Sequence, residues 1–341
     1  MTTAMPTETT RDLPHVHPED VAFFERELDG FVPDKVFDAH VHLWAPNHST
    51  SSFDDLPDTL GCEQLKATLD VLHPGREFAA LLIPFPYPIS DDPSAWENHS
   101  ELANDWMTSQ VGLDPRNRGL FNVQPTHDPE WVRQEVRRRG LHGLKCYHFW
   151  SANKPTWESD IPEYLPEPLI KVAHEEGWCI TLHIVKQRAV ADPQNIHWIR
   201  HYCKTYPNMK LILAHSARGH NPSHNLEGLP QLRGLDNLYF DTSAVCEAVA
   251  HEAILRIIGH EKLLYGSDFL GNRGRCLAVD DSFIWLYRST PVWSDKHLQV
   301  KPVHCALEVT RALKWACWSA GLKDSAIEDI FWNNAASLFN L

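Results

Sequence analysis

The sequence predicts an α/β protein whose strands close into a (β/α)8 TIM barrel. Short apolar runs alternate with helical patterns along the chain, which indicates parallel βαβ units. These runs are nearly continuous in apolar residues, as is typical of strands covered on both faces. Eight of them follow one another, and the 341 residues exceed the roughly 250 residues that such a barrel needs.

The expected elements follow a regular order. A helix over 18–28 comes first, because acidic residues precede an apolar face and Gly30 follows it. Pro84 closes the second strand, since proline cannot donate to a central ladder, and Gly177 ends a later helix. The expected strands are 36–44, 78–83, 119–123, 143–147, 178–183, 209–215, 238–241 and 263–268, and the later helices are 98–111, 130–139, 168–176, 195–206, 252–258 and 302–320.

The residues beyond the barrel minimum follow the ends of expected strands. We therefore predict loop insertions at the C-terminal face. A doubly wound sheet is the weaker alternative, because no Gly-x-Gly-x-x-Gly follows any expected strand. Residues 1–20 are polar and unpatterned and are expected to form a mobile N-terminal arm, with 21–341 as a single barrel domain. The insertions cover about 84–97, 148–166, 217–236 and 269–305.

The charge balance excludes two classes of partner. Forty-five acidic residues against 31 basic ones give a net charge of -14. Such a surface repels nucleic acid and anionic membranes, so we expect neither as a partner. No apolar stretch is long enough to span a membrane, and the first residues lack the basic and apolar regions of a secretory signal.

The cysteines predict the redox compartment. There are eight, without a Cys-x-x-Cys pair, and several stand inside apolar runs. They are expected to be buried thiols of a reducing compartment, which favours a cytoplasmic protein. Dimers are common among such barrels, and by that analogy alone a homodimer is the candidate assembly.

Two histidines stand two residues apart at the end of the first strand. Side chains alternate across a strand, so Asp38, His40 and His42 share one face, and two imidazoles on a rigid strand can hold a divalent metal. The spacing alone does not decide this, because the chain has 21 histidines and His15 and His17 repeat the spacing among polar residues. The strand context favours a metal site at His40 and His42.

Polar side chains end several other strands as well. The C-terminal ends of barrel strands meet on one face, so these side chains would share one pocket there. Imidazole and carboxylate ligands suit Zn²⁺, Mn²⁺ or Fe²⁺, and a catalytic metal keeps one position open for water. The set comprises His40, His42, Lys145, His183, His215 and Asp268.

Five motifs, in this order, resemble the amidohydrolase superfamily. The resemblance spans about residues 34–341, because residues 333–341 also resemble the closing helix of that family. The order of the motifs is specific for the superfamily and not for a substrate. The motifs are Phe37-Asp-Ala-His-Val-His42, Gly143-Leu-Lys-Cys-Tyr147, Thr181-Leu-His183, Leu213-Ala-His215 and Tyr265-Gly-Ser-Asp268.

The chain is most similar to the single-metal branch, which includes aminocarboxymuconate-semialdehyde decarboxylase, related carboxy-lyases, hydrolases and hydratases. This resemblance implies that His40, His42, His183 and Asp268 bind one divalent metal, with zinc expected first and manganese or iron as alternatives. It also implies that Asp268 accepts a proton, while His215 acts beside the metal-activated water as an acid, a base or an electrostatic stabiliser. A binuclear site with a carboxylated Lys145 and His215 remains an alternative.

Arginines near the predicted mouth point to the substrate. In an acidic protein they suggest a small carboxylate-bearing molecule held by bidentate guanidinium contacts, although surface ion pairs are the alternative for each one. Arg218 is the strongest candidate because it lies three residues beyond His215, and Lys145 is the second substrate-binding candidate. The four arginines are Arg188, Arg218, Arg273 and Arg275.

These observations lead to one principal hypothesis and two rivals. The first is a metal-dependent hydrolase that uses metal-activated water on a small carboxylated amide, ester or lactone. The second is a non-oxidative decarboxylase of an aromatic or unsaturated carboxylic acid, which would use the same residues. The third is a barrel that binds a ligand without catalysis, and it predicts a protein that holds no metal.

Overall fold

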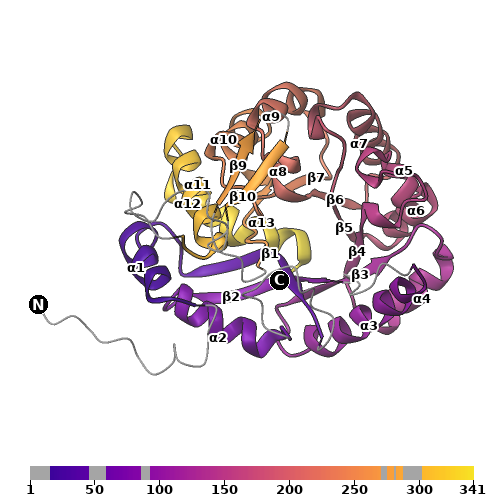
Figure 1. The fold of residues 1–341 in the computed structure, drawn as a ribbon, viewed down its shortest axis with the longest axis horizontal. Coiled ribbons are helices and arrows are strands. Elements are labelled where there is room, and N and C mark those ends of the chain that lie inside the picture. Colours follow the sequence, from indigo (N-terminus) through magenta and orange to yellow (C-terminus); the bar gives the residue numbers. More distant parts are fainter. Residues whose placement is uncertain (1–15, 46–58, 86–92, 270–274, 280–281, 287–301) are drawn as a thin grey trace, which may run out of the picture.

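The computed structural model of the chain contains one eight-stranded sheet whose strands follow the order β1 to β8 (Figure 1). All seven ladders between neighbouring strands are parallel. The predicted (β/α)8 barrel is therefore confirmed. The structure describes residues 16–45, 59–85, 93–269, 275–279, 282–286 and 302–341.

Backbone contacts between the last and the first strand close the barrel. The Ala39 N–H donates to the Tyr265 carbonyl at 2.8 Å and the Asp268 N–H donates to the His40 carbonyl at 3.0 Å. An isolated parallel bridge joins Val41 to Phe269. The strands are β1 (Lys35–Leu43), β2 (Glu77–Pro84), β3 (Arg118–Val123), β4 (Gly143–Cys146), β5 (Cys179–Leu182), β6 (Lys210–Leu213), β7 (Leu238–Asp241) and β8 (Leu263–Leu264).

The barrel interior is filled by side chains from alternate strand positions and is capped at one end by the last helix. Phe37, Leu81 and Ile212 belong to this inner cluster, which also includes Leu338 and Phe339 of the closing helix α13 (Asn334–Phe339). Figure 1 shows the C-terminus over the centre of the ring. The N-terminal end of the barrel is thus sealed, and the opposite end is left for a site.

Helices surround the sheet and bury one face each against its outer surface. Local sequence signals set several ends: Asp128 and Asp192 accept hydrogen bonds from the first free N–H groups of their helices, and Gly177 ends α6 with a φ of 69°. The main helices are α1 (Pro18–Glu27), α2 (Cys62–Leu72), α3 (Pro93–Val111), α4 (Pro129–Arg138), α6 (Glu167–Glu176), α7 (Pro193–Thr205), α10 (Ala248–Ile257) and α11 (Cys305–Ala320).

Two expected strands are wrong at their C-terminal ends. The strand predicted over 209–215 stops at Leu213, because the His215 N–H donates to the Asp241 carboxylate instead of continuing the ladder. The strand predicted over 263–268 ends at Leu264, because the Thr242 hydroxyl bonds both the N–H and the carbonyl of Gly266. The other predicted boundaries differ by a few residues, as is usual for helix and strand ends.

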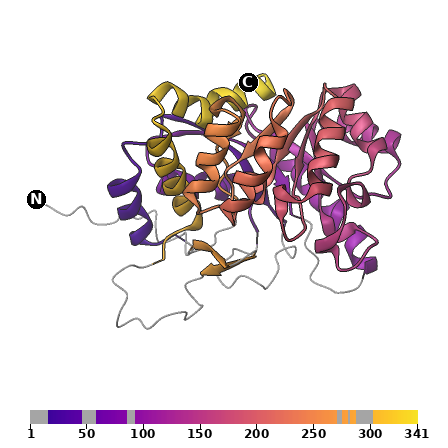
Figure 2. The same ribbon diagram turned by 90° about the horizontal axis from the view of Figure 1, so that it is seen from above.

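The insertions after the strands carry short elements of their own. The segment after β4 contains α5 (Ile161–Tyr164), the segment after β6 contains α8 (Ala214–Arg218) and α9 (Pro222–Gly228), and the segment after β8 contains the hairpin of β9 (Arg275–Val279) and β10 (Ser282–Leu286). Figure 2 shows this hairpin and α13 at opposite edges of the barrel. Residues 86–92 of the predicted 84–97 insertion lie outside the described residues, and 93–97 belong to α3.

Several other expectations concern the termini and the thiols. Of the expected N-terminal arm, residues 1–15 lie outside the described part, Val16 is buried, and Asp20 accepts hydrogen bonds from the His17 and His304 N–H groups. All eight cysteines are free thiols, and Cys62 alone among them is half-buried while the others are buried. Among the described residues, no helix combines the length and apolarity needed to cross a membrane.

A buried histidine at the end of α2 makes stability depend on pH. His73 packs between Phe24 and Phe78, and burial, together with the charges of His304 and Arg76, lowers its pKa to about 3. Between about pH 3 and pH 6.5 the unfolded chain therefore binds up to one more proton than the folded one. The free energy of unfolding should therefore fall between pH 7 and pH 5. We expect this fall to be about 2 kcal/mol smaller in His73→Phe than in the unmodified protein, because phenylalanine binds no proton.

Urea unfolding at both pH values measures this difference. His197→Phe, on the exposed side of α7, is the matched control and should keep the full pH dependence of the unmodified protein. Equal losses for the protein and for His73→Phe would contradict the assignment.

Candidate metal centre

Strand β1 delivers three polar side chains to the open end of the barrel. Asp38, His40 and His42 are all buried, and the Asp38 carboxylate accepts hydrogen bonds from the N–H groups of His40 and Ser267. Burial raises the pKa of Asp38 to about 7, and these hydrogen bonds oppose that rise. Asp38 therefore stabilises the end of the strand through these hydrogen bonds. The two imidazoles lie at the open end of the barrel.

The Asp268 carboxylate lies between these two imidazoles. Its Oδ1 is 3.5 Å from His40 Nε2 and 3.3 Å from His42 Nε2. The three ligand atoms lie within 4.8 Å of one another. His40 Nε2 and Asp268 Oδ1 are buried and have no hydrogen-bond partner among the residues that the structure describes, which is costly for polar atoms unless another group completes the site. This donor set fits a divalent cation.

The orientation of His40 is fixed by Asp241, which sequence reasoning missed. Asp241 Oδ2 accepts from His40 Nδ1 at 2.8 Å, and Oδ1 accepts from the Ser243 hydroxyl at 2.5 Å and from the His215 N–H at 2.9 Å. With its proton on Nδ1, His40 presents the lone pair of Nε2 to His42 and Asp268. Such carboxylate–histidine pairs orient metal ligands and make them more basic.

A second group of possible ligands, His40, His215 and Asp241, is better explained by this hydrogen-bond network. The Ser243 hydroxyl lies 3.1 Å from His40 Nδ1 and 2.8 Å from His215 Nδ1, so each of these nitrogens already has a partner. Asp241 could have been found from the sequence, because it is a polar residue at the C-terminal end of the predicted strand 238–241, as the other candidate site residues are at the ends of their strands.

His215 lies beside the group but outside the strand that was expected to carry it. Its ring centroid is 5.0 Å from that of His40 and 4.8 Å from that of His183. His215 and the next three residues have φ between 49° and 59°, a left-handed turn that costs about 1–2 kcal/mol for each residue with a side chain. Its Nδ1 faces the Ser243 hydroxyl and carbonyl, which leaves Nε2 for a reaction partner.

His183 follows β5 and lies farther from the central group. Its ring is close to those of His215 and of His148, at 5.8 Å, and of Trp157, at 6.1 Å. It is not among the three residues whose ligand atoms lie within 4.8 Å. The structure thus brings His40, His42 and Asp268 together and places His183 beside them, next to His215.

Two cations border this centre, one buried and one half-buried. Lys145, on β4 between Asn122 and Thr181, is 1% exposed, and among the described residues no acidic group forms an ion pair with it. Arg218 is half-buried, donates to the Lys186 carbonyl at 2.6 Å and stacks on Trp157 at 5.1 Å, again without an acidic partner in the described part of the chain.

The other arginines that were considered are paired or lie elsewhere. Arg188 bonds the Glu227 carboxylate. Arg275 contacts Glu308 at 3.6 Å and the Cys246 carbonyl at 3.1 Å, which fastens β9 to the barrel. Arg273 lies outside the described residues.

The local electrostatics keep the histidines neutral and Asp268 ionised. Burial lowers the pKa of His40 and His42 and lowers that of His215 to about 4. Burial alone would raise the pKa of Asp268, but the close contact with His42 and the nearby His215 and His40 hold it well below its usual range. Neutral imidazoles and ionised carboxylates are the forms that ligate metals.

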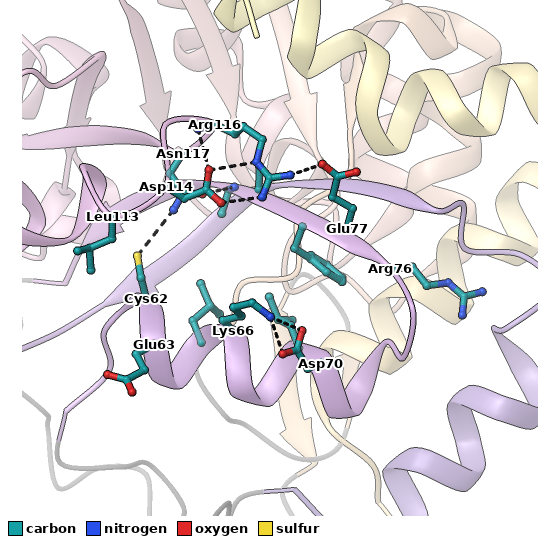
Figure 3. Close-up of a pocket in the computed structure, with 15 residues that line it drawn as sticks. Cys62, Glu63, Lys66, Asp70, Arg76, Glu77, Leu113, Asp114, Arg116 and Asn117 are labelled. Carbon is teal, nitrogen blue, oxygen red and sulfur yellow. Dashed lines mark hydrogen bonds and ion pairs between the residues drawn. The ribbon is translucent and has the colours of Figure 1, made fainter. Parts of the chain in front are cut away.

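A pocket of about 540 Å³ lies elsewhere, between α2 and the first residues of β2 and β3 (Figure 3). Several of its charged residues are paired with one another: Lys66 lies 2.6 Å from Asp70, and Arg116 bonds Asp114 and Glu77. It opens at the N-terminal ends of the strands. It therefore contributes nothing to the metal centre at their C-terminal ends.

A comparison of the sequence with protein-family models decides the family. The model described as Amidohydrolase matches residues 37–341. The chain belongs to the amidohydrolase family. It is therefore an enzyme of a superfamily whose members bind a divalent metal, and the group of His40, His42 and Asp268 is the place in this amidohydrolase that fits one. No curated protein matches the sequence.

Solved structures share the fold of this amidohydrolase at low sequence identity. A protein of Acinetobacter baumannii described as a probable 2-pyrone-4,6-dicarboxylic acid hydrolase, with citric acid bound, is 16% identical, with 90% of this chain and 99% of that one covered and a TM-score of 0.55. The 2,6-dihydroxybenzoate decarboxylase from Rhizobium is 13% identical, with 91% and 99% covered and a TM-score of 0.54.

A third structure contains a metal. It is a dihydroxybenzoic acid decarboxylase from Polaromonas sp. JS666 with bound manganese and the inhibitor 2-nitroresorcinol, 16% identical, with 91% of this chain and 97% of that one covered and a TM-score of 0.50. At these identities the likeness shows the fold alone.

The Asp241 contact with His40 predicts a metal-binding defect at a residue that does not face the cation. Asp241→Asn keeps the shape but removes the charge that favours the Nδ1–H form of His40. We expect the dissociation constant for Mn²⁺ or Zn²⁺ to rise roughly 10- to 100-fold, as measured by calorimetric titration. Asp236→Asn, in the exposed turn before β7, should bind as the unmodified protein does, and equal affinities for both variants would disprove the role of Asp241.

Proposed function

We propose that this amidohydrolase hydrolyses a small carboxylated amide, ester or lactone. In this proposal His40, His42, His183 and Asp268 hold one divalent metal, Asp268 and His215 are the catalytic residues, and Lys145 and Arg218 bind the carboxylate of the substrate. We further propose a cytoplasmic location, which the eight free thiols support.

The observation that carries the substrate class is that Lys145 and Arg218 form no ion pair with an acidic group in the described part of the chain. Burial lowers the pKa of Lys145, whereas Asp241 and Asp268 oppose this effect. Burial also lowers the pKa of Arg218. Buried cations are costly without a counter-ion, and a substrate carboxylate would supply one. Arg188 and Arg275 already have carboxylate partners, so they do not need a substrate carboxylate as a counter-ion.

The residues can divide the chemistry of hydrolysis among them. A divalent cation at this centre would lower the pKa of a water molecule and polarise a substrate oxygen. Asp268, held ionised by the histidines, can accept the proton of the attacking water. His215, with its Nδ1 occupied by Ser243, can use Nε2 to stabilise or protonate the oxygen on which charge develops.

The identity and number of metal ions belong to the same proposal. Imidazole and carboxylate suit zinc, manganese and iron alike, and we propose zinc first. Lys145 lies near enough to lower the pKa of His40, His42 and His215. A carboxylated Lys145 would hold a second metal and is the alternative that metal analysis tests.

Aromatic side chains favour a second candidate function, the non-oxidative decarboxylation of an aromatic acid. Tyr147 and Phe149 stack at 4.9 Å and 19°, and Phe85 lies 5.1 Å from the ring of His42. Planar rings near the centre suit a planar substrate. The decarboxylases from Rhizobium and Polaromonas share the fold and act on dihydroxybenzoates by their names.

A substrate screen with mass balance separates the two candidates. Carboxylated lactones, amides and phenolic acids are incubated with the metal-loaded enzyme in H₂¹⁸O. Hydrolysis predicts ¹⁸O in the product carboxylate and no carbon dioxide. Release of carbon dioxide without uptake of water would refute hydrolysis in favour of decarboxylation.

The ligand assignment predicts the metal content of variants. His40→Ala combined with His42→Ala removes two of the three clustered ligand atoms, so elemental analysis should find metal occupancy reduced to a small fraction of that in the unmodified enzyme. His197→Ala combined with His201→Ala, on α7, is the matched control and should keep full occupancy. A fully occupied His40, His42 variant would refute the assignment.

The carboxylate assignment predicts a change in KM. Arg218→Ala should raise KM for a carboxylated substrate by roughly 10- to 150-fold, because hydrogen bonds to charged groups contribute about 1.5–3 kcal/mol. Arg188→Ala removes an arginine of the neighbouring loop whose partner is Glu227 and should leave KM unchanged. Similar KM values for both variants would argue against a role of Arg218 in binding.

A further inference from the structure

The left-handed turn after β6 carries two residues of the proposed site. It begins at His215 and ends at Arg218, with φ values of 59°, 49°, 57° and 57°. None of the four is glycine, the residue that adopts this conformation without steric cost. A run of such residues persists only when its surroundings hold it in place.

Ser216 is anchored at its side chain by a buried histidine. Its Oγ lies 2.8 Å from His251 Nδ1, and His251 Nε2 lies 3.0 Å from the Val245 carbonyl. A carbonyl can only accept, so Nε2 carries the proton and Nδ1 accepts from the Ser216 hydroxyl. Burial lowers the pKa of His251 to about 4, which is consistent with this neutral form.

Ser216 is also anchored at its backbone. Asn225 of α9 donates from Nδ2 to the Ser216 carbonyl at 2.7 Å. The Gly219 N–H then donates to the His215 carbonyl at 2.7 Å. A Cβ at Gly219 would lie 2.8 Å from Asn225 Oδ1, so this close approach requires glycine. The turn is therefore clamped between α9 and α10 at its second residue.

We propose that Ser216 and His251 are positioning residues that hold this turn, so that the His215 imidazole and the Arg218 guanidinium border the metal centre. The inference rests on the proposed roles of His215 and Arg218. Ser216 and His251 are both 0% exposed, so neither can touch a substrate. Through the backbone of the turn they position both His215, a catalytic residue of the proposed reaction, and Arg218, a substrate-binding residue.

Two substitutions and their combination test the clamp. Ser216→Ala removes the hydroxyl that reaches His251 and should release the turn. Because both site residues move, kcat should fall and KM should rise, each by roughly 10- to 100-fold. Ala217→Gly relieves the strain without touching either anchor and should keep both constants. The double variant should recover most of the activity, since glycine lowers the cost of the left-handed turn.

Ser100→Ala is the matched control, since Ser100 is a buried serine whose hydroxyl bonds the Asn122 side chain on β3. It should lower the unfolding midpoint about as much as Ser216→Ala does and leave kcat and KM unchanged. Should Ser216→Ala fail to fold, His251→Phe keeps the ring volume but removes the acceptor, and the same kinetic and structural changes are expected.

Crystal structures of these proteins give a readout that needs no substrate. Positive φ values at residues 215–218 in the unmodified protein and the double variant, with their loss in Ser216→Ala or His251→Phe, would support the inference. A turn that stays left-handed in the single anchor variants would overturn it. If no screened substrate reacts even with the unmodified enzyme, the proposed function fails while these φ values still decide about the clamp.

Discussion

The site depends on the backbone contact between the last barrel strand and the first. The Asp268 N–H reaches the His40 carbonyl at 3.0 Å, and the same residue places its carboxylate 3.3 Å from His42. One residue thus closes the sheet with its backbone N–H and supplies the oxygen of the candidate metal group with its side chain. Asp268 has a φ of 56°, a left-handed conformation that is uncommon for residues other than glycine, and it occurs where the last strand of the barrel meets the first.

The charged side chains around that contact differ in how many partners they have. Asp241 accepts from His40, Ser243 and the His215 backbone. Although burial raises its pKa, the His40 imidazole, the nearby His215 side chain and the Ser243 hydroxyl lower it to about 2. Within the described segments, Asp268 has no such set of donors, and no carboxylate forms an ion pair with Lys145 or Arg218. Asp241 is therefore the anion of the centre whose hydrogen bonds are complete. A metal cation would complete the contacts of Asp268, and a substrate anion would pair with Lys145 and Arg218.

The sequence predicted those features that depend on local periodicity. Alternating runs gave eight strands, and the period of two gave His40 and His42 a common face. Asp268 was predicted because polar side chains at the C-terminal ends of barrel strands meet on one face, and this prediction did not depend on the length of β8, which is only two residues long. The contact of Asp241 with His40 joins residues 201 positions apart, and no local pattern encodes such a pair.

The ends of β6 and β8 could not be predicted, because side chains replace the ladder there. Asp241 bonds the His215 N–H and Thr242 bonds Gly266. The left-handed turn was equally hidden, since His215-Ser-Ala-Arg218 contains none of the glycines that announce such a conformation.

The closing helix has a consequence for how the protein is made. Leu338 and Phe339 complete the inner cluster that begins with Phe37, and Arg118 at the start of β3 bonds the Phe339 carbonyl. The interior cannot be shielded from water until this stretch has left the ribosome. Until then the nascent barrel exposes apolar strand faces, and this amidohydrolase should rely on chaperones during synthesis more than a protein whose core is complete early in translation.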